Sequence, residues 1–148
     1  MNNQTVLVTG NAGFIGSNLT KKLLALGYRV IGVDNFNDYY NPLIKERNIA
    51  EFKKNFKQYC LDILDKEKLK LIFDNEKPKI IIHLAARAGV RPSLLNPELY
   101  YQVNVEGTKN LLKLAKKFAV KQFIFASSSS VYGNQTKVPF SETDRLGK

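Results

Sequence analysis

Cysteine is nearly missing from this sequence. Cys60 is the only one among 148 residues, so an internal disulfide bond and a metal cluster built on several thiolates are both excluded. We therefore expect no metal site. Such sparse use of cysteine is typical of a protein in the reducing cytoplasm, where we expect the chain to reside.

Long apolar runs are missing as well. No run approaches the roughly 18 residues that a membrane helix needs, and residues 1–5 lack the basic and apolar segments of a signal peptide. The composition, 44% hydrophobic and 24% charged, is typical of a globular domain. We expect one domain over residues 1–148 and no contact with a membrane.

Acidic residues are in deficit, because 13 of them stand against 23 basic ones, for a net charge of +10. Arginine, however, supplies only five of the basic residues. A nucleic-acid groove normally interleaves arginine with exposed aromatic residues. We interpret the lysines as solvated helix faces and expect no nucleic-acid partner, although the charge would attract an anionic nucleotide.

One glycine-rich stretch organises the chain. The strand-like run Val6–Thr9 is followed by glycines at positions 10, 13 and 16 and by an amphipathic segment, Phe14–Leu26, whose apolar stripe includes Ile15. The order strand, tight turn, helix is typical of the first unit of a dinucleotide-binding fold. The alternative is a glycine-rich turn that binds nothing.

Each glycine has its own expected task. Gly10 allows a turn with positive φ, Gly13 lets the backbone approach a pyrophosphate, and Gly16 allows the helix to lie close to the strand. The free N–H groups around Phe14 and Ile15, at the positive end of the helix dipole, would then face the phosphates.

A second strand ends in a carboxylate. Arg29–Asp34 places Asp34 about 20 residues after the glycines, where an acidic residue binds the ribose hydroxyls of NAD. A carboxylate at this position also repels the 2′-phosphate of NADP. NAD is therefore the favoured cofactor.

The remaining chain alternates between strand and helix patterns. Strands are expected at 56–61, 79–86 and 122–127, and helices from 42, over 65–75 and over 97–118. The helix from Pro42 is expected to carry Leu43, Ile44 and Ile49 toward Phe52. The alternation predicts an α/β fold, a doubly wound parallel (Rossmann-like) sheet ordered 3-2-1-4-5.

Three ring-bearing side chains invite a functional interpretation. His83, the only histidine, lies inside an apolar strand, so we expect a satisfied core residue rather than a ligand or base. Tyr39 and Tyr40 follow the second strand and either cover the adenosine or simply pack; the sequence leaves both possibilities open.

Four further stretches carry a family resemblance. Together with the glycines, the segments 62–63, 84–91, 104–108 and 127–133 resemble the extended short-chain dehydrogenase/reductase family, the NAD-dependent epimerases and dehydratases that act on nucleotide sugars. Within that family, segments 89–93 and 127–133 are most similar to UDP-glucuronate 4-epimerases. The resemblance covers essentially the whole chain.

The resemblance implies a set of NAD contacts. They would be Gly10, Gly13, Phe14, Ile15 and Gly16 at the pyrophosphate, Asp34, Asn35 and Asn37 at the adenosine ribose, Asp62 and Ile63 beside adenine, and Leu84, Ala85 and Ala86 along the cleft.

Ser128 matches the family's catalytic serine, with Ser129 and Ser130 beside it in the substrate site. Hydroxyls just beyond a strand's carboxyl end lie where open α/β sheets bind ligands. Dehydratases of the family carry Asp-Glu in place of Ser129 and Ser130, and decarboxylases tend to carry glutamate in place of Ser130. The resemblance therefore favours epimerisation, by oxidation and re-reduction at C4, over dehydration or decarboxylation; a serine loop without a role is the alternative.

Three other residues are candidates for the UDP-sugar site. Arg91 is the first candidate for binding the substrate anion and Arg87 a weaker one, because a guanidinium binds carboxylate or phosphate bidentately. Both could equally be surface arginines. Asn104 resembles the family's active-site asparagine, or it ties down a neighbouring loop.

The family's catalytic base, the tyrosine of a Tyr-x-x-x-Lys pair, has no match in these 148 residues. Counted from Ser128, the pair would begin just past Lys148. We expect an amino-terminal part of the enzyme that binds NAD but is inactive alone, and that self-associates through its incomplete sheet. A non-catalytic nucleotide-binding module is the alternative.

Overall fold

The computed structural model describes residues 4–147 and contains one five-stranded sheet, in which every pair of neighbouring strands is parallel. The strand order is β3-β2-β1-β4-β5, which confirms the predicted doubly wound topology. The strands are β1 (Thr5–Thr9), β2 (Arg29–Asp34), β3 (Lys57–Cys60), β4 (Ile80–His83) and β5 (Gln122–Phe125).

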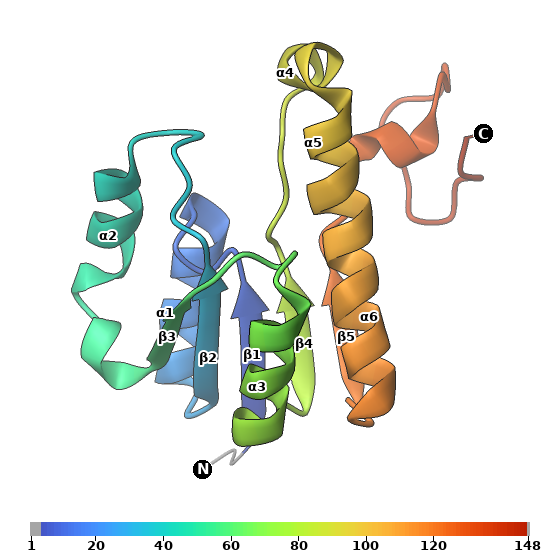
Figure 1. Cartoon of the computed structure of the whole chain (residues 1–148). Coiled ribbons are helices and arrows are strands. Elements are labelled where there is room, and N and C mark those ends of the chain that lie inside the picture. Colours follow the sequence, from blue (N-terminus) through green and yellow to red (C-terminus); the bar gives the residue numbers. More distant parts are fainter. Residues whose placement is uncertain (1–3, 148) are drawn as a thin grey trace.

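Helices cover both faces of the sheet, with α1 behind it and α3 and α6 in front in the view of Figure 1. The α-helices are α1 (Phe14–Ala25), α2 (Pro42–Ala50), α3 (Lys66–Glu76), α4 (Val90–Leu95), α5 (Pro97–Tyr101) and α6 (Thr108–Lys117). Within residues 4–147, no helix combines the length and apolar character needed to cross a membrane.

The core lies in two layers, one on each face of the sheet. Leu7, Ile31 and Ile81 pack against α3 and α6, whereas Val8 and Ile82 pack against α1. Successive residues of a strand point to opposite faces, so strands covered on both sides must be apolar throughout. This requirement explains why the central strands are continuous apolar runs in the sequence.

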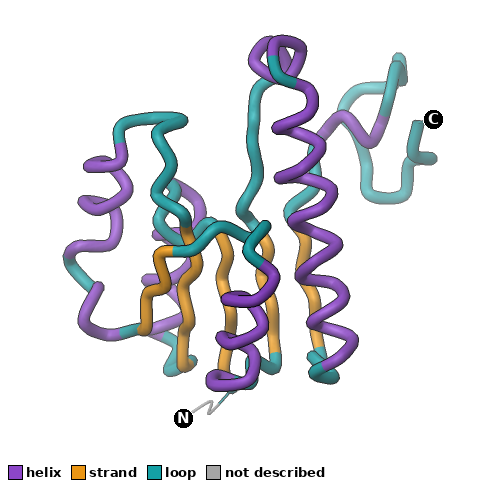
Figure 2. Tube along the Cα trace, viewed as in Figure 1, coloured by secondary structure: helices purple, strands orange, loops and turns teal. Residues whose placement is uncertain are grey.

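The long helix before β5 is continuous but not uniform. Between α5 and α6, the segment Gln102–Gly107 is π-helical, and Figure 2 shows the three parts as one unbroken helix. The sequence predicted the helix but not the change in winding. Gly107 lies so close to Ile63 that a Cβ there would stand 2.5 Å from the Ile63 Cδ1 atom.

Three of the expected inward positions are wrong. Leu43 and Ile44 are 57% and 46% exposed, because α2 lies beside the sheet and buries only the face that carries Lys45 and Ile49. Ile15 is 68% exposed, because it lies in the first turn of α1, at the end of the sheet rather than over it. A stripe of apolar residues predicts that one face of a helix is buried, but it does not show how far along the helix the sheet covers that face.

Candidate functional site

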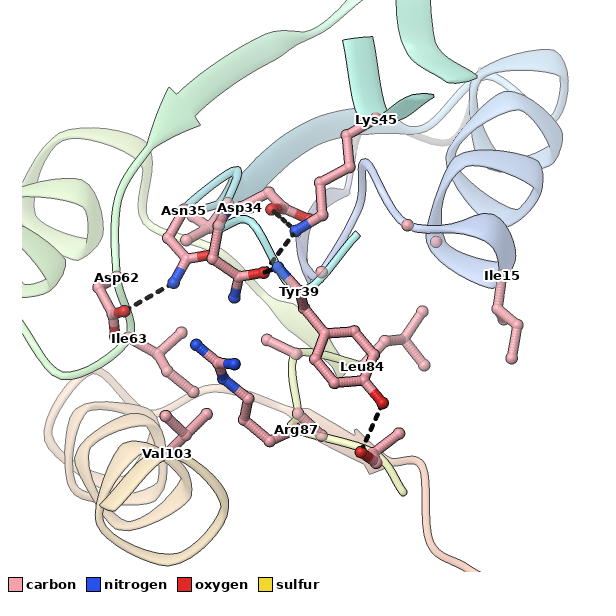
Figure 3. A pocket seen from close by; sticks show the side chains of 18 of the residues that line it. Ile15, Asp34, Asn35, Tyr39, Lys45, Asp62, Ile63, Leu84, Arg87 and Val103 are labelled. Carbon is pink, nitrogen blue, oxygen red and sulfur yellow. Dashed lines mark hydrogen bonds and ion pairs between the residues drawn. The ribbon is translucent and has the colours of Figure 1, made fainter. Parts of the chain in front are cut away.

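A cleft of about 350 Å³ opens at the carboxyl ends of the parallel strands (Figure 3). Its walls come from the turn before α1, the loop after β2, the chain after β3, the loop after β4 and the π-helical segment. This is the end of an open α/β sheet at which ligands generally bind. The cleft is therefore the candidate site.

All thirteen residues that the sequence assigned to the cofactor line this one cleft. They are Gly10, Gly13, Phe14, Ile15, Gly16, Asp34, Asn35, Asn37, Asp62, Ile63, Leu84, Ala85 and Ala86. They come from four separate segments, each at the carboxyl end of a strand, so only the fold brings them together. Their contacts with a cofactor remain a prediction.

Two glycines of the turn are packed too tightly for side chains. Gly10 has a φ of +71°, and a Cβ there would stand 2.8 Å from the backbone nitrogen of Ala85. A Cβ on Gly16 would overlap the carbonyl of Gly10. Gly13 precedes α1 without a side-chain cap, so the first N–H groups of the helix stay open toward the cleft. The turn thus has the form of an anion cradle.

Asp34 is held by two donors on one of its oxygens. The carboxylate is 6% exposed, and its Oδ1 accepts hydrogen bonds from the Phe36 backbone N–H at 2.8 Å and from Lys45 Nζ at 2.9 Å. No donor among residues 4–147 reaches Oδ2. Sequence reasoning missed Lys45, because no motif marks a lysine one helix further along the chain.

The opposite wall of the cleft contains a second pair of hydrogen-bonded polar side chains. Asn35 donates a hydrogen bond from Nδ2 to Asp62 Oδ2 at 2.7 Å, and Asp62 Oδ1 accepts from the backbone of Leu64 at 2.9 Å. Ile63 and Val103 lie beside this pair (Figure 3). An apolar wall next to fixed carboxylate and amide groups suits a flat heterocycle with polar edges.

Tyr39 joins two loops across the cleft. Its hydroxyl donates to the carbonyl of Ala88 at 2.8 Å, so the loop after β2 is tied to the loop after β4. The Arg87 guanidinium lies 5.9 Å from the Tyr39 ring centre and points into the cleft (Figure 3). In the described part of the chain, no acceptor reaches the buried Nε of Arg87.

Asn104 secures the backbone of Arg87. Its Oδ1 accepts from the Arg87 N–H at 2.8 Å, and its Nδ2 donates to the Arg87 carbonyl at 3.0 Å. The structure therefore shows the loop-tying role, while a contact with substrate remains a prediction. Asn104 itself does not line the cleft.

Arg87, the weaker candidate for the substrate anion, lines the cleft, whereas the other residues predicted for the substrate lie outside it as well. Ser128, Ser129 and Ser130 are exposed just beyond β5, and Arg91 is exposed on α4. Ser128 begins a short 3₁₀ helix, where its Oγ accepts from the Ser130 backbone N–H at 3.2 Å. The serines follow the cleft residue Ala126 directly, so they border the cleft without forming its wall.

His83 is a satisfied core residue, as the sequence predicted. It is 1% exposed and lies between the hydroxyls of Thr9, at 2.6 Å from Nδ1, and Thr108, at 2.9 Å from Nε2. Because the Thr108 hydroxyl donates to the Asn104 carbonyl, it must accept from Nε2–H, which makes Nδ1 the acceptor for Thr9. Burial lowers the pKa of His83 to about 4, so the ring is neutral at pH 7.

Known proteins resemble this chain along nearly its whole length. The family described as GDP-mannose 4,6 dehydratase matches residues 7–147. A UDP-glucuronate 4-epimerase from Thermodesulfobacterium geofontis is 50% identical over 138 residues, covering 92% of this chain and 42% of that protein. A probable UDP-glucuronate 4-epimerase from Rhizobium meliloti is 43% identical over 141 residues, covering 94% of this chain and 41% of that protein.

A solved structure shares the fold. The UDP-glucose 4-epimerase from Bifidobacterium longum, in complex with NAD⁺ and UDP, is 38% identical and superposes with a TM-score of 0.86. The match covers 97% of this chain and 43% of that one. The chain thus spans less than half the length of these relatives.

Proposed function

The chain belongs to the GDP-mannose 4,6-dehydratase family of NAD-dependent epimerases and dehydratases, and we propose that it is the cofactor-binding part of a nucleotide-sugar 4-epimerase. The observation that carries this proposal is the single cleft that gathers the glycine turn, Asp34 and the Asn35–Asp62 pair. The UDP-glucuronate 4-epimerases among the relatives support the proposal.

The residues of the cleft fit NAD. The glycine turn, where a Cβ at Gly10 or Gly16 would meet backbone atoms, lies beside the first N–H groups of α1 and could hold a diphosphate, and the unpaired Oδ2 of Asp34 can accept from ribose hydroxyls. The buried Nε of Arg87 is a donor still without an acceptor among residues 4–147. Asp62, Ile63 and Val103 would border the adenine.

The substrate would be a UDP-sugar, with UDP-glucuronate as the first candidate. Its sugar would bind beside the serines that follow β5. NAD, when bound, supplies the hydride acceptor for oxidation at C4. The Ser128 hydroxyl would hydrogen-bond the C4 oxygen, with Ser129, Ser130 and Asn104 as further substrate contacts. Arg91 would pair with the anionic part of the substrate, because a guanidinium binds carboxylate or phosphate through two parallel hydrogen bonds.

The loop that contains Ser129 and Ser130 also distinguishes epimerisation from the other reactions of the family. Loss of water or of CO₂ from the sugar would call for a carboxylate where Ser129 and Ser130 stand, and neither side chain can serve as a proton donor and base of that kind. A dehydratase or decarboxylase of the same family is therefore disfavoured. A non-catalytic nucleotide-binding module is the second candidate; no Tyr-x-x-x-Lys occurs in these 148 residues, which span less than half the length of the relatives.

Calorimetry with NAD⁺ tests the binding part of the proposal, and we expect saturable heat from the 148-residue chain. Incubation with NAD⁺ and UDP-glucuronate tests the chemistry. We expect no UDP-galacturonate, because the tyrosine base is not among these residues; its formation above a protein-free control would refute that expectation. An in-frame Tyr-x-x-x-Lys encoded after Lys148 would support the epimerase, and an immediate stop codon the binding module.

A further inference from the structure

Lys45 places a buried positive charge in the wall of the cleft. Its side chain is 7% exposed and that of Asp34 is 5% exposed, and the two are joined by the 2.9 Å contact between Nζ and Oδ1 (Figure 3). Burying two charges costs more hydration energy than most such pairs regain, so stability alone is a weak reason for the pair. Both residues line the cleft, where a ligand can use them.

The Asp34–Lys45 pair does not use all of its hydrogen-bonding groups. Oδ1 of Asp34 already accepts from Phe36 and Lys45, so Oδ2 is the oxygen left without a donor among residues 4–147. The Lys45 ammonium has three N–H groups. One is used by Asp34 and a second reaches Asn37 Oδ1 at 3.5 Å, which leaves a third donor without an oxygen acceptor among residues 4–147, in an ammonium group that also lies 5.4 Å from the Tyr40 ring centre.

We propose that Lys45 is a specificity-determining residue for the cofactor, and that the Asp34–Lys45 pair, rather than Asp34 alone, sets the choice between NAD and NADP. The inference rests on the proposed NAD site. A ribose hydroxyl can donate to Oδ2 of Asp34 and accept from Nζ of Lys45 at the same time. A 2′-phosphate in that place is repelled by the carboxylate but attracted by the ammonium, so the pair rejects NADP less strongly than a lone carboxylate would.

Removing the cation should therefore sharpen the discrimination. Calorimetry would give the ratio of the dissociation constants for NADP⁺ and NAD⁺ in the wild-type chain and in Lys45→Met. We expect the ratio to rise at least about tenfold in Lys45→Met, because a charge-assisted hydrogen bond to phosphate is lost while the carboxylate remains. Arg47→Met is the matched control, since it removes an exposed cation from the same helix and should leave the ratio unchanged.

A second comparison guards against misfolding of Lys45→Met, which leaves a buried carboxylate without its partner. Asp34→Asn removes the repelling charge, and Asp34→Asn combined with Lys45→Met removes both charges. We expect the single variant to bind NADP⁺ at least about tenfold more tightly than the double variant, with a smaller difference for NAD⁺.

The outcomes separate this inference from the proposed function. If the wild-type chain gives no heat with NAD⁺, both are overturned. Only this inference is overturned if NAD⁺ binds but two results follow. Lys45→Met and Arg47→Met would then have the same ratio of the dissociation constants for NADP⁺ and NAD⁺, and Asp34→Asn would have the same ratio as the double variant. Equal losses of affinity for both cofactors would mark Lys45 as a structural residue and would overturn it too.

Discussion

At the scale of the residue, Gly13 offers the sharpest test of the anion cradle. A Cβ at Gly13 would stand 3.3 Å from the Gly10 carbonyl oxygen, far less crowded than at Gly10 or Gly16, so a side chain requires the neighbour to shift by only a few tenths of an ångström. Gly13→Asp would set a carboxylate against the diphosphate, and we expect its affinity for NAD⁺ in calorimetry to fall at least about tenfold.

The matched control for Gly13→Asp is Asn18→Asp. It adds the same charge to an exposed position one turn further along α1, away from the cleft. The control should bind NAD⁺ within about twofold of the wild-type chain, because an exposed charge is screened by solvent and salt. Similar losses in both variants would show that net charge, not the cradle, governs binding.

His83 makes a prediction about pH. Burial holds its pKa near 4 in the folded chain, below the ordinary value of 6.5, so the unfolded chain binds more protons between these two values. The free energy of unfolding should therefore fall as the pH is lowered through this window, by about 1–2 kcal/mol between pH 6.5 and 5. Urea titrations at both pH values measure this loss.

A variant without the imidazole isolates this effect. His83→Gln cannot titrate in that window and should lose clearly less stability than the wild-type chain over the same pH range, whatever its stability at pH 7. Equal losses in the two proteins would mean that other groups cause the pH dependence.

At the scale of the element, one hydrogen bond links two loops that line the cleft. The Tyr39 hydroxyl ties the loop after β2 to Ala88 in the loop after β4, and a bound cofactor would lie beneath this bridge. One hydrogen bond contributes about 0.5–1.5 kcal/mol. Tyr39→Phe should therefore release NAD⁺ about two- to tenfold faster in a stopped-flow displacement experiment.

Tyr100 provides a control that differs only in geometry. Its hydroxyl donates to the same Ala88 carbonyl at 2.6 Å, but from α5, so the bond does not cross the cleft. Tyr100→Phe removes the same chemical group and should leave the release rate within about twofold. Faster release in both variants would assign the effect to the Ala88 loop itself.

The elements themselves could be predicted from the sequence, because their signals are local. Asn41 and Asp65 cap α2 and α3 with their side chains, Gly27 follows α1 with a φ of +80°, and the strands are apolar runs. The order of the strands followed from right-handed crossovers. The π-helical segment could not be predicted, since it adds no residue pattern of its own.

The partners of buried charges were beyond the reach of sequence patterns. Lys45 meets Asp34 from the next helix, and Glu76, 3% exposed, meets Lys57 and Arg29 from two different strands. Such contacts depend on how the elements pack, and any of several lysines could have filled each role. The thirteen cofactor residues, by contrast, follow strand ends, so topology alone brought them together.

At the scale of the whole molecule, the sheet has an uncovered border. Within residues 4–147, β5 pairs with β4 only, and its Ile124 and Phe125 are 43% and 54% exposed. Unpaired strand edges with apolar side chains tend to pair with another chain. The net charge of +10 opposes this association, but salt at about 0.15 M screens charges beyond about 8 Å. We therefore propose that β5 pairs with a second copy when the 148-residue chain is studied alone.

Sedimentation velocity at increasing protein concentration measures this association. We expect the wild-type chain to form dimers or larger species at high concentration, and Ile124→Lys to shift it toward monomer, because a charged side chain on an edge strand disfavours pairing. Leu71→Lys is the control, since Leu71 is 57% exposed on α3, away from β5. A wild-type chain that stays monomeric throughout, or an equal shift in both variants, would show that β5 is not the contact.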